Sequence, residues 1–187
     1  ILMGGHIGKK GAGLCPVRGH SNVQGDRTVG IWERPSEAFL SRLDAACGIE
    51  SPREHGVDVV EAIQQMRDGG ADLFFCMGGN FISATPDTEA TAEGLRNVKL
   101  TVQVSTKLNR SHLVTGETAL ILPCLGRTEM DIQESGKQFV TVENSMGIVH
   151  TSEGSLRPAS THLRSEVWIV SSLATAALSD TRDWMEL

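Results

Sequence analysis

Residues 71–87 read Ala-Asp-Leu-Phe-Phe-Cys-Met-Gly-Gly-Asn-Phe-Ile-Ser-Ala-Thr-Pro-Asp, and this stretch decides the fold. Its apolar run, 73–77, is too short for a typical helix and rich in aromatic residues, so it predicts a strand buried on both faces, as parallel strands are. Two glycines end the strand. A helix follows, capped either by Thr85, with Pro86 as its first residue, or by Asp87. Because backbone amides gather where a strand gives way to a helix, the stretch predicts a site for an anionic ligand.

Helix and strand signals alternate on both sides of this stretch. Ser36 is a helix cap, and Asp58 with Glu61 three residues later has the pattern of a capping box at the start of a second helix. Further strands are expected at 100–104 and 119–122, with a third helix before them and a polar segment with a short helix between them. This order predicts an α/β fold in which three parallel strands are joined by crossover helices.

The remaining segments are predicted to surround this sheet domain. Residues 1–35 form a glycine-rich shaped loop, and 36–179 form the domain itself. After the third strand, 139–142 and 147–150 alternate in polarity, which predicts a small antiparallel ribbon. A helix capped by Ser165 follows, and 180–187 form a frayed tail. The chain does not begin with methionine, and its first residues already resemble the sequence of a folded domain. We therefore expect it to be part of a longer protein.

Composition excludes several classes of protein. The chain has 187 residues, 40% of them hydrophobic, and a formal net charge of -6, which argues against a nucleic-acid surface. No apolar run has the length of a membrane span, and no signal peptide is visible, so we expect a cytoplasmic protein without a membrane partner. The cysteines are too far apart for a zinc or redox motif and are expected to be reduced: Cys15, Cys47, Cys76 and Cys124.

Several common sequence motifs of enzymes and nucleotide-binding proteins are incomplete or absent. The segment at Gly8-Lys9 lacks the earlier glycine and the following hydroxyl residue of a phosphate loop. Gly11 and Gly13 begin a dinucleotide fingerprint, but its third glycine position holds Pro16 and no strand precedes it. The histidines do not have the spacing of zinc ligands, and no serine stands in a nucleophile elbow. A nucleophilic enzyme or zinc hydrolase is therefore disfavoured.

The loop around Arg18 is dense in hydrogen-bond donors. Arg18 offers a planar fork suited to a carboxylate or phosphate. His20, Asn22 and Gln24 alternate, so in an extended segment they lie on one side and read the polar edge of a heterocycle. On residue types alone the alternative is a loop stabilised by hydrogen bonds from its own side chains to its backbone.

A specific resemblance favours the first interpretation. Residues 12–25 read Ala-Gly-Leu-Cys-Pro-Val-Arg-Gly-His-Ser-Asn-Val-Gln-Gly. They resemble the Asn-Pro-Val-Arg-Gly-Gln-Asn-Asn-Val-Gln-Gly loop of molybdopterin-dependent formate dehydrogenases in the dimethyl sulfoxide reductase family. The similarity continues at Met-Gly-Gly-Asn-Phe (77–81), Ser-Thr-Lys-Leu-Asn-Arg-Ser-His (105–112) and Ala-Leu-Ile-Leu-Pro (119–123). Nearly the whole chain is covered, and the formate dehydrogenase-like alpha subunits resemble it best.

The resemblance implies a Rossmann-like domain and assigns roles to particular residues. Arg18 matches the arginine that orients the substrate anion near the metal, and His20 stands where those enzymes usually carry glutamine, so both are expected at the reacting end. The residues that would hold the cofactor are Asn22, Gln24, Met77, Gly78, Gly79, Asn80, Ser105, Thr106, Asn109 and His112. No residue of this chain is expected to ligate the metal.

The implied cofactor is a bis-molybdopterin guanine dinucleotide with molybdenum, accompanied by an iron-sulfur cluster. The family's cluster cysteines and metal ligand belong to upstream segments, and a further cofactor domain lies downstream. The expected partners are therefore a small anion such as formate and the remaining domains of the same polypeptide, and the isolated chain is expected to hold no cofactor and to be inactive. Two alternatives stay open: a non-redox nucleotide- or pterin-binding module, and a relative that kept the fold and lost the cofactor.

Overall fold

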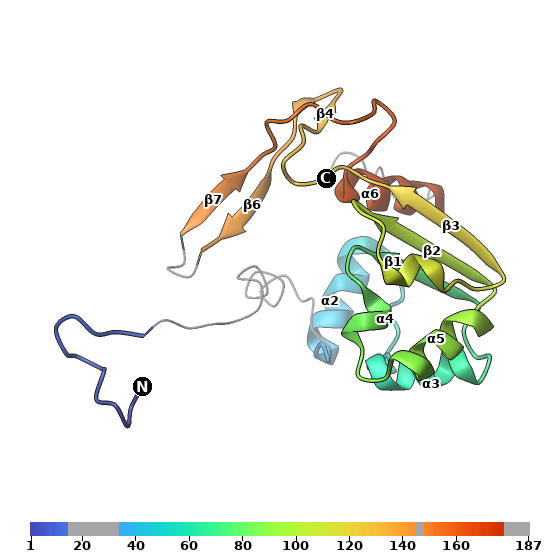
Figure 1. Cartoon of the computed structure of the whole chain (residues 1–187), viewed down its shortest axis with the longest axis horizontal. Helices are drawn as coiled ribbons and strands as arrows, with labels where there is room; N and C mark the ends of the chain where they lie inside the picture. The colour runs from blue at the N-terminus through green and yellow to red at the C-terminus, as the bar shows by residue number, and fades with distance from the viewer. Residues whose placement is uncertain (15–33, 145–147, 178–187) are drawn as a thin grey trace. The chain divides into compact units, whose positions relative to one another are not determined.

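A computed structural model describes residues 1–14, 34–144 and 148–177 (Figure 1). The chain divides into two compact units. One comprises Ile1–Pro35 with Val140–Ser152, and the other comprises Ser36–Phe139 with Glu153–Leu187. The second unit contains the parallel sheet.

The sheet has three parallel strands in the order β1-β2-β3. β1 is Leu73–Met77, β2 is Leu100–Ser105 and β3 is Thr118–Pro123. Leu73 pairs with Leu100, which in turn pairs with Thr118, so the three strands start level and their carboxyl ends lie at one edge. The predicted α/β class, a parallel sheet flanked by helices and followed by an antiparallel ribbon, is confirmed.

Three helices lie on one side of the sheet and build the core (Figure 1). They are α3 (Val59–Arg67), α4 (Phe81–Ala84) and α5 (Thr88–Asn97). Their apolar side chains form the core cluster: Ile63, Met66, Ile82, Ala92 and Leu95, with Val98 just after α5. Phe74 of β1 packs against this cluster and meets Phe81 with ring centroids 4.9 Å apart. This packing fixes the start of α4 directly after the turn that follows β1.

A buried glycine lets two of these helices approach closely. Gly94 lies in α5, and a Cβ added there would be 3.1 Å from the Cβ of Met66 and 3.2 Å from the carbonyl oxygen of Ile63. Glycine inside a helix costs about 1 kcal/mol relative to alanine. Here the missing side chain is what brings α5 against α3.

Three of the four predicted helix starts are confirmed, those at Ser36, Asp58 and Ser165. Ser36 caps α2 (Glu37–Cys47) by accepting from the Phe39 amide. Asp58 and Glu61 form the expected capping box at α3. For the third helix the sequence left Thr85 and Asp87 as candidate caps, and the structure has Asp87, which accepts from the Ala90 amide. A helix that begins at Pro86 is therefore wrong, because α5 begins at Thr88. Thr85 instead ends α4, and its hydroxyl bonds the hydroxyl of Thr91 at 2.7 Å.

The prediction that β1 is buried on both faces is also wrong. Leu73 is 55% exposed and Phe75 is 37% exposed, while Phe74 between them packs on the core. Alternate residues of a strand point to opposite faces. Only the face that carries Phe74 is therefore covered within the part of the chain that the structure describes.

The structure also contains short elements. The short helix expected between the second and third strands is confirmed as η1 (Arg110–Leu113). Helix α4 and the hairpin of β4 (Ile132–Gln133) with β5 (Gly136–Lys137) were not predicted, because segments of two to four residues carry no periodicity. The expected helix after Ser165 is present as α6 (Glu166–Ala177), with the Ser165 hydroxyl accepting from the Trp168 amide.

The first unit contains the predicted ribbon. β6 (Val140–Glu143) and β7 (Val149–Ser152) pair antiparallel, with Val140 opposite Ser152 and Glu143 opposite Val149. The strands lie one to two residues later than the alternation of polarity indicates. A shift of this size is within the ordinary error of strand ends predicted from a sequence pattern.

Candidate functional site at the carboxyl edge of the sheet

The turn after β1 is shaped by two glycines in the left-handed region. Gly78 has φ 68° and Gly79 has φ 73°, values that side-chain-bearing residues rarely adopt. The Gly78 amide donates to the Val104 carbonyl at 2.7 Å, which continues the β1–β2 pairing past the end of the strand. A Cβ on Gly79 would meet no atom within 4 Å among the described residues. The turn is therefore open on the Gly79 side.

The loop after β2 is hydrogen-bonded to this turn. The Asn109 side-chain amide donates to the Gly79 carbonyl at 2.7 Å. The Ser111 hydroxyl donates to Oδ1 of Asn80 at 2.9 Å and accepts from the Ile82 amide at 3.1 Å. Residues about thirty positions apart in sequence are thus joined at one edge of the sheet, where ligands of parallel α/β sheets bind.

His112 braces this loop from inside. Its side chain is buried, and its Nδ1 accepts from the Asn109 amide at 3.0 Å, as part of the capping box of η1. Since Nδ1 accepts, a neutral ring carries its proton on Nε2. Within the described ranges, Nε2 is the one buried side-chain nitrogen or oxygen without a hydrogen-bond partner. A buried donor of this kind costs about 1–3 kcal/mol unless an acceptor reaches it.

The other predicted residues of this edge differ in exposure. The Ser105 hydroxyl donates to the Lys107 carbonyl at 2.6 Å, so it holds its own loop. Thr106 is exposed, and Met77 is half-buried at the end of β1. The structure therefore brings Gly79, Asn80 and Asn109 together, with His112 behind them.

The segment after β3 completes the edge with residues that the sequence did not single out. Cys124 is buried, and its amide donates to the Ser105 carbonyl at 3.2 Å. Glu129 accepts from the Gly126 amide at 2.7 Å and from the Ala159 amide at 3.2 Å, which ties the segment after β3 to the segment before α6. These contacts span up to 30 residues of sequence, and no local pattern signals them.

Negative charge surrounds Cys124. Burial raises the pKa of its thiol, and the carboxylates of Glu166 and Glu129 raise it further. Burial also raises the pKa of the Cys76 thiol on β1. Because the thiolate is the reactive form, neither cysteine has the environment of a nucleophile. Glu166 also lies beside the first glycine of the turn, since a Cβ on Gly78 would be 3.7 Å from its Oε1.

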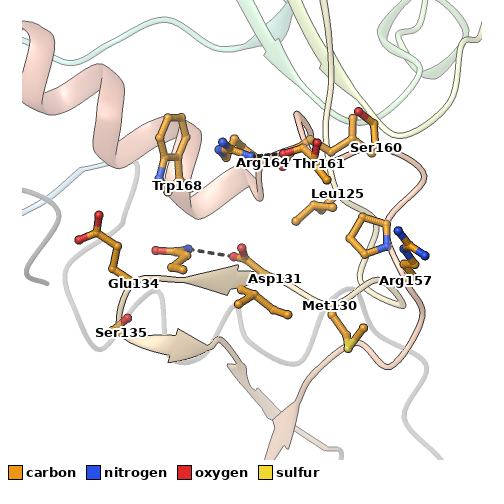
Figure 2. Close-up of a pocket in the computed structure, with 14 residues that line it drawn as sticks. Leu125, Met130, Asp131, Glu134, Ser135, Arg157, Ser160, Thr161, Arg164 and Trp168 are labelled. Carbon is orange, nitrogen blue, oxygen red and sulfur yellow. Dashed lines mark hydrogen bonds between the residues drawn. The ribbon is translucent and has the colours of Figure 1, made fainter.

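A cleft of about 1160 Å³ lies next to this edge (Figure 2). It lies between the segment after β3 and the segment that leads into α6, which are joined by the bond from the Leu125 amide to the Arg164 carbonyl at 2.9 Å. The Arg164 guanidinium lies 5.3 Å from the centre of the Trp168 ring and donates to the Thr161 and Leu163 carbonyls. Figure 2 shows Arg164 between Trp168 and Thr161. Trp168 belongs to the helix that the sequence predicts after Ser165, and it was not predicted as a site residue.

Other predicted residues lie outside the described ranges. Arg18, His20, Asn22 and Gln24 all fall within residues 15–33, so their predicted roles stay predictions. Across the described residues, no group of three or more His, Cys, Asp or Glu side chains is arranged to hold a metal ion. In the same residues, no helix has both the length and the apolar character needed to cross a membrane.

The chain is similar to part of several longer proteins, some of which are named oxidoreductases. It is 63% identical over 176 residues to a protein of Mycobacterium tuberculosis named an uncharacterized oxidoreductase, a match that covers 94% of this chain and 23% of that protein. It is 53% identical over 178 residues to protein YdeP of Escherichia coli, covering 95% of this chain and 24% of YdeP. No family model matches the chain.

A third protein, similar over a shorter stretch, is also named an oxidoreductase. The probable oxidoreductase YjgC of Bacillus subtilis is 31% identical over 86 residues, which cover 42% of this chain and 9% of that protein. The chain thus spans about a quarter of the length of the first relatives that it matches. The chain therefore resembles one part of longer proteins, two of which are named oxidoreductases.

Proposed function

We propose that the chain forms one wall of a molybdopterin guanine dinucleotide site in a formate dehydrogenase-like oxidoreductase. The names of the relatives support the redox part of this proposal. The resemblance of residues 12–25 and 77–81 to the family's loops supports the cofactor. The observation that carries it is the hydrogen-bonded link of Gly79 and Asn80 to Asn109 and Ser111 at the carboxyl edge.

The groups at this edge fit a ligand rich in acceptor oxygens. Space is open above Gly79, and the Asn80 side chain is half-buried at the end of the turn. The buried Nε2 of His112 lacks an acceptor, which a bound group with an oxygen or ring nitrogen would supply. The carboxylate of Glu166 beside Gly78 repels anions, so a phosphate would lie on the Gly79–Asn80 side.

Roles follow for the residues of this chain. The turn from Met77 to Asn80, with the loop residues Ser105, Thr106, Asn109 and His112, would hold the dinucleotide, and Asn22 and Gln24 would read its polar edge. Arg18 would orient a small anion such as formate, beside His20. The cofactor, when bound, supplies the metal that exchanges electrons with the substrate. Its metal ligand and the iron-sulfur cluster would be held by other segments of the polypeptide.

An assay of formate oxidation tests these roles. Mixed with formate and an artificial electron acceptor, the 187-residue chain alone is expected to give no acceptor reduction, whereas the longer polypeptide that carries it reduces the acceptor. In that polypeptide, Arg18→Lys is expected to raise KM for formate, because lysine offers no planar fork for a carboxylate. Turnover by the isolated chain would contradict the proposal.

A second candidate is a nucleotide- or pterin-binding module without redox chemistry. It is favoured by one observation: the linked residues Gly79, Asn80, Asn109 and Ser111 all belong to this chain, so they form a contact surface without other segments. Calorimetry with guanosine diphosphate distinguishes the two. Tight binding by the isolated chain, together with absence of metal from the longer polypeptide, would favour the second candidate.

A further inference from the structure

Ser111 of η1 is hydrogen-bonded to three other parts of the domain. It is 3% exposed. Its hydroxyl accepts from the Ile82 amide at 3.1 Å and donates to Oδ1 of Asn80 at 2.9 Å. Its carbonyl accepts from the Gln103 side chain at 3.0 Å. Ser111 is thus bonded to the turn after β1, to the start of α4 and to the central strand β2.

These bonds decide which end of the Asn80 amide faces outward. A serine hydroxyl has one proton and two lone pairs. Because the Ile82 amide donates to the oxygen, the hydroxyl proton is available for Asn80, and it meets the side-chain oxygen. The Asn80 Nδ2 group then has no hydrogen-bond partner among the described residues. Asn80 is half-buried, and its Nδ2 is not fully enclosed by the described residues.

We propose that Ser111 is a positioning residue, which holds Asn80 by its oxygen so that Nδ2 donates to a phosphate oxygen of the ligand bound at the turn. The inference rests on the proposed function, because it takes the ligand to be a nucleotide. Asn109 supports it by holding the Gly79 carbonyl, which turns that acceptor away from an incoming anion. The edge then presents a fixed donor next to an open glycine.

The test compares three variants of the 187-residue chain. Ser111→Ala releases the Asn80 amide. Asn80→Asp keeps an oxygen for the Ser111 hydroxyl but replaces the donor with a negative charge. Ser83→Ala is the matched control, since Ser83 is an exposed α4 residue whose side chain makes no hydrogen bond in the described part of the chain.

Binding of guanosine diphosphate and of guanosine is measured by calorimetry, and the Asn80 side-chain amide is followed by NMR. We expect Ser111→Ala to weaken guanosine diphosphate binding about tenfold and to shift the Asn80 amide signals. Asn80→Asp is expected to weaken it about a hundredfold and to weaken guanosine binding much less, because the new charge repels the phosphates. Ser83→Ala behaves as the unaltered chain.

The results of these experiments distinguish failure of nucleotide binding from failure of the proposed role of Ser111. If the unaltered chain binds neither probe, the phosphate contact of Asn80 in this chain is refuted, whereas the proposal that the chain is one wall of a larger cofactor site is tested by metal and pterin analysis of the longer polypeptide. The Asn80 signals in Ser111→Ala then test the positioning. Unchanged Asn80 signals in that variant would overturn the role of Ser111. If Ser111→Ala does not fold, Asn80→Asp decides alone: equal losses for guanosine and guanosine diphosphate would overturn the phosphate contact.

Discussion

Gly94 of α5 lies against Met66 of α3 so closely that a Cβ at position 94 would be 3.1 Å from the Cβ of Met66. Alanine favours helix over glycine by about 1 kcal/mol, but overpacking a core costs about 1–3 kcal/mol. The second effect is the larger one at this contact. We expect Gly94→Ala to lower the free energy of unfolding in urea. Gly56→Ala is the control, because a Cβ there would meet no atom of the described residues within 4 Å; greater loss in the control would contradict this packing.

Leu95, the neighbour of Gly94, is fully buried at 0% exposure within the core cluster. Leu95→Ala removes buried methyl groups and leaves a cavity, so we expect a loss of about 2–5 kcal/mol in the free energy of unfolding. Leu113 is 83% exposed, and Leu113→Ala is expected to have little effect. Urea unfolding of the two variants measures the difference; similar losses would show that the core lies elsewhere.

The turn after β1 predicts a backbone effect without a steric one. Gly79 has φ 73° and open space around it, so Gly79→Ala meets no clash but forces alanine into the left-handed region. We expect a loss of about 1–2 kcal/mol in stability, and a smaller loss for Gly79→Asn, since asparagine tolerates this conformation. Thermal melting distinguishes them. Equal melting temperatures for all three chains would contradict the turn geometry.

Asp44 gives the fold a pH dependence. Hydrogen bonds from Ser51 and Arg53 hold the pKa of its carboxyl below the ordinary value of 3.8. A carboxyl whose pKa is lowered by folding stabilises the folded chain above its unfolded pKa. That contribution is lost as the pH falls through the lowered folded pKa. Acid unfolding of Asp44→Asn is expected to lack this part of the pH dependence below about pH 4; an unchanged acid profile would contradict it.

Much of the fold could be predicted because its signals are local. The caps Ser36 and Asp58 satisfy helix amides within three residues of themselves, so sequence alone identifies them. Thr85 is the instructive exception: the pattern Thr-Pro-Asp contains two possible caps. Its hydroxyl bonds Thr91 and leaves the capping to Asp87, a choice made by packing between α4 and α5.

The site could be predicted only in part. Gly78 to Asn80 and Asn109 carry recognisable loop sequences, and the structure joins them by a hydrogen bond between Asn109 and Gly79. The brace at Ser111 and the carboxylates around Cys124 arise from residues distant in sequence, for which a single sequence has no signal. The exposed face of β1 was missed for a similar reason, since an apolar run does not say which residues will cover it.

The central claim is that this chain lines a molybdopterin cofactor, and a metal and pterin analysis of the purified polypeptide in which the chain occurs tests it most directly. We expect molybdenum or tungsten together with a guanine-bearing pterin, released in constant ratio when the protein is denatured. Polypeptide that carries neither metal nor pterin would contradict the claim.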